Sequence, residues 1–310
     1  MISVEEMAAD LKGLANAPLA IGEDEDFRIS IAGAQEKTAY LAVDGAWAKP
    51  RGATPTSHIF KTPMGILPGP EQIDLSDSVE NKLFCMTLAR EMGMPVASVT
   101  RIELPDQKAL AIERFDRVWT DGVLSRLPQE DLCQSLGVPS AMKYQKSGGP
   151  GIRDIMQVLR ESDQAGVDRE TFFRAQILFF LIGASDGHAK NFSLRLSARG
   201  RFTLAPLYDI LSVAPVVHSG RLQRRRYRLA MSIDGHFGID EIVPRHFENE
   251  GRACGLPAGR ATDLLADMAG RLGPALERTQ GKLDNLVPDT VVQPIQIESL
   301  RRAEEIRQML

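Results

Sequence analysis

The stretch ASDGHAKNFSLRLSARGRFTLAPLYD, residues 184–209, decides the fold and the chemistry expected of this chain. An apolar run with helical spacing, residues 169–182, leads into it. Two short strand-like runs follow, 192–196 and 202–204, separated by the turn-forming residues Ala198-Arg199-Gly200. The stretch therefore predicts a buried helix, a polar loop and a β-hairpin that ends shortly before a second aspartate.

The polar residues of this stretch suit phosphoryl transfer. Asp186 is placed to accept the proton of an attacking hydroxyl, and Asn191, five residues later, to hold Mg²⁺. Asp209, after the hairpin, completes a metal site of the kind that binds the β- and γ-phosphates. The D-x-x-x-x-N spacing is that of the protein-kinase catalytic loop, although Tyr-Asp-Ile stands where kinases carry Asp-Phe-Gly. Alone, the hexapeptide is more typical of a helix-capping turn, so the interpretation depends on its position.

Strand-like runs around a single helix predict a small sheet-based lobe over residues 1–117. Alternation of apolar and polar residues marks the strands, and a polar start with a closing glycine marks the helix. The small residues Ala32-Gly33-Ala34 form the expected turn of the first hairpin. The expected strands are 28–31, 38–43, 58–61, 97–103 and 109–115, and the expected helix is 76–93.

Residues 118–310 change in character, because long apolar patterns at helical spacing replace the strands. They predict helices over 152–160, 169–182 and 260–278, with another near the C-terminus. The fold class is therefore α+β: a two-lobed, protein-kinase-like arrangement with a mixed β-sheet N-lobe and a mainly helical C-lobe. Such an arrangement is expected to place a ligand-binding cleft between the lobes.

Composition limits the classes of protein that remain. The 310 residues carry 37 Lys+Arg against 41 Asp+Glu, a net charge of −4, with 25% charged and 43% hydrophobic residues. This balance excludes a disordered tail and a collagen-like repeat, and it argues against a dedicated nucleic-acid binder. Cys85, Cys133 and Cys254 have no paired spacing and are interpreted as buried thiols in a reducing cytosol. The weakly apolar start and the short apolar run 177–184 predict a cytoplasmic protein without membrane contact.

The N-lobe offers residues for a nucleotide. The turn between the first two strands, residues 31–35, has small residues whose backbone N–H groups can face phosphates, although an ordinary hairpin explains it equally well. Lys61, on the next strand, can neutralise phosphate charge, with Glu80 as a possible orienting partner; a solvated lysine is the alternative. Glu113 and Phe115 end a strand where a hinge segment would meet an adenine ring.

Two further features have competing interpretations. His188 has no second histidine at a ligand spacing, so a zinc site is not expected. Residues 221–228, RLQRRRYR, carry five arginines in eight positions. They can contact phosphates of a nucleic acid or of a substrate, but a solvated loop or strand edge is the favoured interpretation.

Seven segments, in order between residues 27 and 247, resemble the HipA family of toxin serine/threonine kinases. The resemblance is most specific in RLPQEDLCQSLGVPSAMKYQ and IGASDGHAKNFS, and it also includes FRISIAGAQEKTA, HIFKTP, ERFDR, GGPGI and PLYDILS. It implies a bacterial toxin–antitoxin kinase, dependent on ATP and Mg²⁺, that phosphorylates an aminoacyl-tRNA synthetase. Inhibited translation, growth arrest and persistence are the implied outcomes. A HipB-like helix-turn-helix antitoxin is the implied repressor, so contact with DNA is expected mainly through that partner.

The resemblance also implies a role for individual residues. Asp186 becomes the catalytic base, and Asn191 and Asp209 the Mg²⁺ ligands. Ser30 matches the family's autophosphorylated serine, whose modification expels the phosphate-covering loop and inactivates the kinase. The implied ATP-contacting residues are Ala32, Gly33, Ala34, Gln35, Glu36 and Lys37 of that loop, Lys61, Glu113, Arg114 and Phe115 of the hinge, and His188, Lys190 and Tyr208.

The chain departs from the full-length members of the family in two places. Those members carry about a hundred residues before the FRIS segment, whereas this chain has 26. It therefore resembles the short HipT type of three-gene HipBST systems, which implies a separate HipS-like protein as a possible antitoxin. Many short relatives have two serines in the loop, but Ala32 leaves Ser30 alone, which puts a two-site switch in doubt.

The expected function is a protein serine/threonine kinase toxin. A lipid or small-molecule kinase is the first alternative, because D-x-H-x-x-N also resembles phosphoinositide kinases, but no lipid-binding helix is evident. An inactive kinase-like scaffold in a repressor complex is the second. The presence of Lys61, Asp186, Asn191 and Asp209 together argues against the scaffold.

Overall fold

The computed structural model describes residues 1–14, 35, 37–67 and 72–310, and these divide into two compact units. The first, here the sheet unit, contains residues 1–83 and 97–127. The second, the helical unit, contains residues 84–96 and 128–310. The sequence-based division after residue 117 placed residues 84–96 in the N-lobe. The first of these residues continue the helix that begins at Ser78 in the sheet unit.

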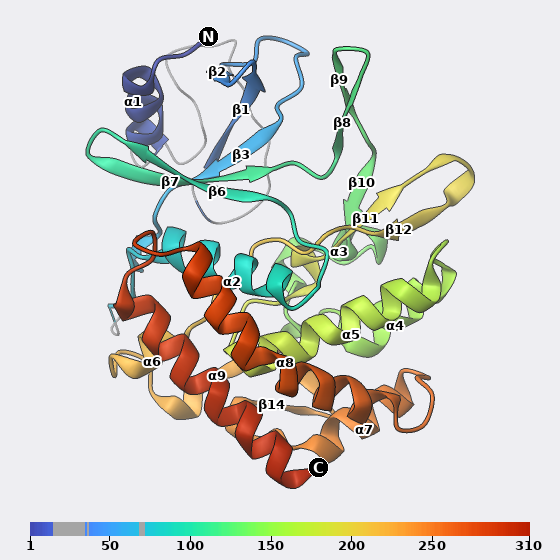
Figure 1. Cartoon of the computed structure of the whole chain (residues 1–310). Helices are drawn as coiled ribbons and strands as arrows, with labels where there is room; N and C mark the ends of the chain where they lie inside the picture. The colour runs from blue at the N-terminus through green and yellow to red at the C-terminus, as the bar shows by residue number, and fades with distance from the viewer. Residues whose placement is uncertain (15–34, 36, 68–71) are drawn as a thin grey trace. The chain divides into compact units, whose positions relative to one another are not determined.

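A five-stranded antiparallel sheet forms the centre of the sheet unit, with strands in the order β2-β1-β3-β7-β6 (Figure 1). Met7 and Leu11 of α1 pack on the sheet against Tyr40 and Phe60, whose rings meet edge to face at 5.0 Å. The elements of this unit are α1 (Val4–Leu14), β1 (Lys37–Val43), β2 (Ala46–Ala48), β3 (His58–Lys61), β4 (Gly65–Ile66), β5 (Asp74–Leu75), the start of α2 (Ser78–Glu91), β6 (Val99–Leu104), β7 (Gln107–Glu113), β8 (Arg117–Thr120) and β9 (Val123–Arg126).

Three long helices, α5, α8 and α9, pack on one another in the helical unit (Figure 1). From Phe172 to Ile182 nearly every residue of α5 is buried, which explains its continuous apolar sequence. The elements of this unit are β10 (Gln129–Asp131), α3 (Leu132–Ser135), α4 (Ile152–Val158), α5 (Ala165–Ile182), β11 (Ser193–Leu196), β12 (Phe202–Leu204), α6 (Ala214–His218), β13 (Arg228–Ile233), β14 (His236–Gly238), α7 (Pro244–Ala253), α8 (Arg260–Lys282) and α9 (Asp289–Met309).

Most elements expected from the sequence are confirmed. Strand 58–61 is β3, the expected helix 76–93 is α2, and the hairpin of the opening stretch is β11–β12. The sheet unit and the mainly helical unit confirm the α+β class, and the five-stranded sheet is antiparallel throughout. The expected strand 28–31 and turn 32–34 lie outside the described residues. The sequence analysis did not predict α1, β8–β9 or β13–β14.

Two smaller expectations concern cysteines and membranes. All three cysteines are buried and free, as expected, and burial raises the pKa of the Cys85 thiol to about 12. Within the described ranges, no helix combines the length and the apolar character that a membrane span needs.

The end of α5 is fixed by a close approach at Gly183. This residue closes the helix with a left-handed φ of +68°, which glycine adopts without strain. A Cβ built on Gly183 would lie 1.5 Å from the hydroxyl oxygen of Tyr227. The neighbouring carbonyl of Ile182 accepts a hydrogen bond of 2.6 Å from Ser212 Oγ. Gly183 therefore determines the direction in which the chain leaves α5 toward Asp186. It also leaves the space that the side chain of Tyr227 occupies.

We predict that Gly183→Ala destabilises the helical unit by more than about 3 kcal/mol. The left-handed backbone costs alanine about 1–2 kcal/mol, and the displaced Tyr227 adds the cost of overpacking. Gly200→Ala is the matched control, because Gly200 has a φ of +72° but open space at its Cβ. The denaturation midpoint in urea, followed by circular dichroism, measures both. Equal losses for the two variants would contradict the packing argument.

Candidate active site

The loop after α5 brings Asp186 and Asn191 together. Asn191 ends a 3₁₀ turn, Ala189–Asn191, and its Nδ2 donates a 2.7 Å hydrogen bond to the backbone carbonyl of Asp186. This bond closes the loop and leaves the amide oxygen of Asn191 as the atom that can face a cation. The Asp186 side chain is about half exposed, so a substrate hydroxyl can reach it.

Tyr144 and His188 flank the carboxylate of Asp186. The hydroxyl of Tyr144 donates a hydrogen bond of 2.5 Å to Asp186 Oδ1, and its ring meets that of His188 edge to face at 5.0 Å. Burial, with the charge of Asp186, raises the pKa of Tyr144, which therefore stays a proton donor at neutral pH. The sequence analysis quoted Tyr144 within a family segment but assigned it no role; its presence in KYQ was the available signal.

His188 is buried beside the same carboxylate. Its Nε2 lies 3.8 Å from Asp186 Oδ1, and its Nδ1 has no hydrogen-bond partner among the described residues. Burial lowers the pKa of His188 and outweighs the opposing charge of Asp186, so the imidazole is neutral near pH 7. A neutral ring can pack against Tyr144 and accept or donate one hydrogen bond to a ligand.

Tyr208 connects Asp209 to the same loop. The buried hydroxyl of Tyr208 lies 2.7 Å from Ser193 Oγ and donates to the carbonyl of Lys190 at 2.9 Å. Burial raises the pKa of Tyr208, so the hydroxyl keeps its proton. Asp209 itself has a φ of +59°, a conformation that costs a non-glycine residue free energy and is concentrated at functional sites. The expected metal-binding aspartate is thus held next to the loop of Asn191.

The side chain of Lys190 forms an ion pair with Asp131 and is largely buried. Its Nζ lies 2.7 Å from Asp131 Oδ2, and both side chains are more than four-fifths buried. Asp131 also caps α3 by accepting from the backbone N–H groups of Cys133 and Gln134. The pair ties the catalytic loop to α3 and β10. Its role toward ATP, expected from the resemblance, stays a prediction.

In the sheet unit, three lysines lie around Gln35. Lys37 of β1 and Lys61 of β3 occupy directly opposite positions in the antiparallel pair. Gln35 donates to the carbonyl of Thr62 at 2.6 Å and accepts from Lys82 Nζ at 2.5 Å. Directly opposite residues lie on the same face of a sheet, so these two cationic side chains share one face of the β1–β3 pair. Lys82 was missed from the sequence because its place on α2 resembles any helix-surface lysine.

Two of the other expected residues of the sheet unit, Arg114 and Glu80, have charged partners in the same unit. Arg114 binds Asp116 through Nε at 3.0 Å and Nη2 at 2.7 Å. Glu80 is held by Lys108 at 2.8 Å and Arg101 at 3.5 Å. Glu113 is exposed at the end of β7, and Phe115 follows it, half-buried. Ser30, Ala32, Gly33, Ala34 and Glu36 lie outside the described residues.

Comparison with known proteins identifies a family for most of the chain. Residues 29–276 match the family described as HipA-like C-terminal domain. A Sinorhizobium fredii protein named "Putative kinase Y4mE" is 39% identical over 204 residues, 65% of this chain and 46% of that protein. The serine/threonine-protein kinase toxin HipA of Shewanella oneidensis is 26% identical over 288 residues, 89% of this chain and 62% of that protein. The chain thus spans about half to three fifths of the length of these relatives.

Solved structures give the same fold. The Shewanella oneidensis HipA in complex with HipB and its operator DNA superposes with a TM-score of 0.80 at 24% identity, covering 99% of this chain and 72% of that one. The Helicobacter pylori proinflammatory kinase CtkA gives a TM-score of 0.57 at 12% identity, covering 91% of this chain and 92% of that one. The expected kinase-like fold is confirmed. With four fifths of its residues matched, the chain belongs to the HipA-like C-terminal domain family.

Proposed function

We propose that the chain is a protein serine/threonine kinase that uses Mg·ATP and acts as the toxin of a toxin–antitoxin pair. The observation that carries the proposal is the half-exposed carboxylate of Asp186, oriented by the hydroxyl of Tyr144 and closed in a loop by Asn191. This is the arrangement that a base needs to accept a proton from a substrate hydroxyl. Names of relatives such as the HipA kinase toxin support the same class.

The side chains of the candidate site are of the types that bind Mg²⁺ and the phosphates of ATP. Amide and carboxylate oxygens, such as those of Asn191 and Asp209, are the ligands that Mg²⁺ prefers. The opposed pair Lys37 and Lys61 provides positive charge for phosphates. When bound, Mg·ATP supplies a γ-phosphoryl group whose charge the metal partly neutralises.

Asp186 accepts the proton of the attacking serine or threonine hydroxyl in this mechanism. Tyr144 holds the carboxylate in one orientation, and Asn191 and Asp209 hold the cation. Lys61 neutralises phosphate charge, with Lys37 and Lys82 nearby. The predicted contacts of Gln35, Glu113, Arg114, Phe115, His188, Lys190 and Tyr208 with the nucleotide belong to the same proposal.

The proposal extends to partners and location. A helix-turn-helix antitoxin is supported by the solved neighbour, which contains HipA, HipB and operator DNA. A HipS-like protein, autophosphorylation at Ser30 and a substrate such as an aminoacyl-tRNA synthetase follow from the family resemblance. Phosphorylation of that substrate would inhibit translation and arrest growth, and the kinase would act in the bacterial cytoplasm.

We expect expression of the wild-type chain to arrest growth and that of Asp186→Asn to leave growth normal. The amide keeps the shape and the hydrogen-bond acceptor of the carboxylate but cannot take a proton. Phosphoproteomics of the two cultures would show a protein phosphorylated in the wild type alone. Growth arrest without such a protein would instead favour a lipid or small-molecule substrate, and arrest by Asp186→Asn would contradict a catalytic role.

We predict that Tyr144→Phe lowers kcat for phosphate transfer roughly tenfold to a hundredfold and leaves KM for ATP nearly unchanged. A hydrogen bond to a charged group contributes about 1.5–3 kcal/mol, and this one orients the base rather than the nucleotide. Phenylalanine keeps the ring contact with His188, whereas Tyr144→Leu removes it as well. Steady-state kinetics of both variants separates the hydroxyl from the ring. A rise in KM without loss of kcat would disprove the orienting role.

A further inference from the structure

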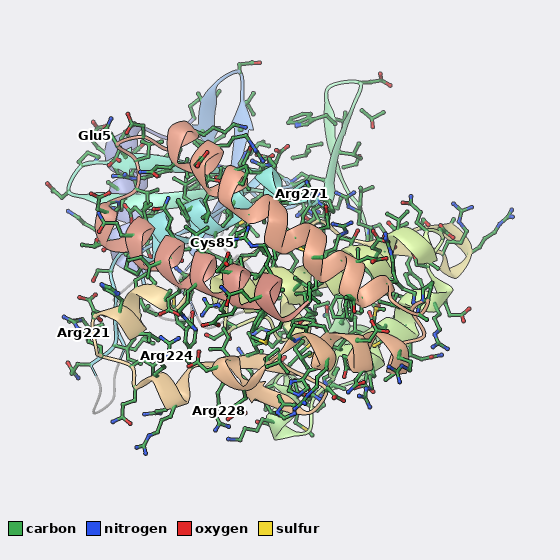
Figure 2. The ribbon with its side chains drawn as sticks, turned by 60° about the horizontal axis from the view of Figure 1, so that its bottom comes forward. Glu5, Cys85, Arg221, Arg224, Arg228 and Arg271 are labelled. Atoms are coloured by element: carbon green, nitrogen blue, oxygen red, sulfur yellow. The ribbon has the colours of Figure 1, made fainter. Side chains whose placement is uncertain are left out.

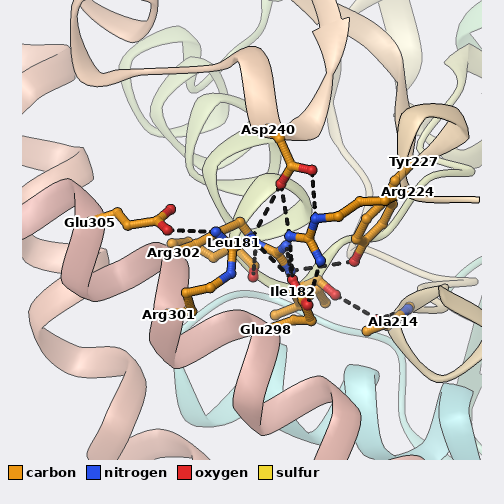
Figure 3. Close-up of polar contacts among 11 residues, drawn as sticks. Leu181, Ile182, Ala214, Arg224, Tyr227, Asp240, Glu298, Arg301, Arg302 and Glu305 are labelled. Carbon is orange, nitrogen blue, oxygen red and sulfur yellow. Dashed lines mark hydrogen bonds and ion pairs between the residues drawn. The ribbon is translucent and has the colours of Figure 1, made fainter. Parts of the chain in front are cut away.

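In the arginine-rich segment 221–228, Arg224 and Tyr227 contact other parts of the helical unit, whereas Arg225, Arg226 and Arg228 form an outward set. Arg224 forms bidentate contacts with Asp240, at 2.8 and 2.9 Å, and also reaches Glu298 at 2.8 Å (Figure 3). Tyr227 is 1% exposed and packs against Gly183. These two side chains anchor the segment in the helical unit. Arg225, Arg226 and Arg228 are therefore left on the surface, where all three are exposed.

A lysine from a distant part of the chain joins the outward set. Lys146 lies in a 3₁₀ turn, Gln145–Ser147, that is tethered to β13. The tether is the side-chain oxygen of Gln145, which accepts hydrogen bonds from the backbone N–H of Ser232 at 2.7 Å and from its hydroxyl at 3.2 Å. Lys146 is thus held beside the strand that begins at Arg228. Figure 2 labels Arg221, Arg224 and Arg228 of this segment.

Together these residues line one solvent-open depression. Its volume is about 560 Å³, and its lining is Lys146, Arg225, Arg226 and Arg228, which we call the basic depression. Neither Lys146 nor Arg228 forms an ion pair with a described residue. Asp240 and Glu298, the acidic partners of Arg224, also bind Arg301.

The charge of the basic depression requires an anionic ligand with several charges. Four cations held together repel one another, and arginine stays charged at any physiological pH. A guanidinium offers a fork of donors that matches phosphate oxygens, and three guanidinium groups with one ammonium exceed what one phosphate needs. A nucleic-acid duplex presents one charge about every 1.7 Å of its axis. Among the residues that the structure describes, the lining includes no aromatic side chain on which a base could stack.

We propose that the basic depression binds the phosphodiester backbone of a nucleic-acid duplex, without preference for base sequence. The contact is electrostatic, so its strength falls with salt. This contact does not require ATP or the loop of Asp186. A test of the proposal is therefore independent of a test of the kinase function. The chain's overall charge of −4 does not oppose it, because a local basic surface decides such binding.

Fluorescence anisotropy of a labelled 20-base-pair DNA duplex, titrated with the purified chain from 50 to 200 mM KCl, tests the proposal. The logarithm of the binding constant should fall with the logarithm of salt concentration with a slope of about −3 to −4, or about −0.9 per cation. In the double variant Arg225→Gln/Arg228→Gln, the magnitude of this slope should decrease by about 2. Arg252→Gln, an exposed arginine of α7 outside the depression, should leave it nearly unchanged. Circular dichroism verifies that all variants are folded.

Further titrations distinguish a DNA backbone from an RNA backbone. An RNA duplex of the same length is titrated in the same way. Binding of RNA as tight as that of DNA, or tighter, also supports the proposal, and the duplex that binds more tightly shows which nucleic acid the depression prefers. Polyglutamate, an anion without phosphate, should not displace either duplex at equal charge concentration. The proposal is overturned if neither duplex binds, if polyglutamate displaces the duplex equally well, or if Arg225→Gln/Arg228→Gln behaves like Arg252→Gln.

Discussion

A buried guanidinium, that of Arg302, joins three parts of the helical unit at the point where α5 ends. It is 1% exposed, donates to the carbonyl of Leu181 at 2.9 Å, pairs with Glu298 at 3.0 Å and reaches the hydroxyl of Tyr227 at 3.4 Å (Figure 3). The Leu181 carbonyl belongs to the last turn of a helix, where carbonyls lack partners within the helix. Arg302 therefore stabilises the end of α5, from which the chain continues to Asp186.

The ion pairs around Arg302 also explain why the candidate site and the basic depression lie in the same unit. Burial would raise the pKa of Glu298, but hydrogen bonds from Arg224 and Arg301 and the charge of Arg302 lower it to about 2. Glu298 is thus charged at every physiological pH and keeps Arg224 turned inward. Breaking the buried pair of Arg302 and Glu298 by removing one partner leaves an uncompensated charge, which typically costs about 3–5 kcal/mol. The same contacts that fix the catalytic loop therefore also fix the segment that carries the exposed arginines.

The parts of the fold that were predictable are those with local signals. Strand β3 and the hairpin β11–β12 were recognised from alternation and turn residues, and the loop between α5 and β11 from its polar residues after an apolar helix. Contacts between residues distant in sequence carried no such signal. Nothing local indicates that Tyr144 would meet Asp186, 42 positions later, or that Arg302 would be buried within an otherwise amphipathic helix. For the same reason, the opposite roles of Arg224 and Arg225 could not be separated before their partners were known.

The central claim is that Asp186 acts in the chemical step of phosphate transfer and not in binding the nucleotide. The direct measurement is a paired one on the purified chain and Asp186→Asn: the Mg·ATP dissociation constant by calorimetry, and the rate of γ-phosphate transfer from labelled ATP. The account predicts a dissociation constant unchanged within about threefold and a transfer rate at least about a hundredfold lower. Transfer at the wild-type rate by Asp186→Asn, or no binding of Mg·ATP by the wild-type chain, would contradict it.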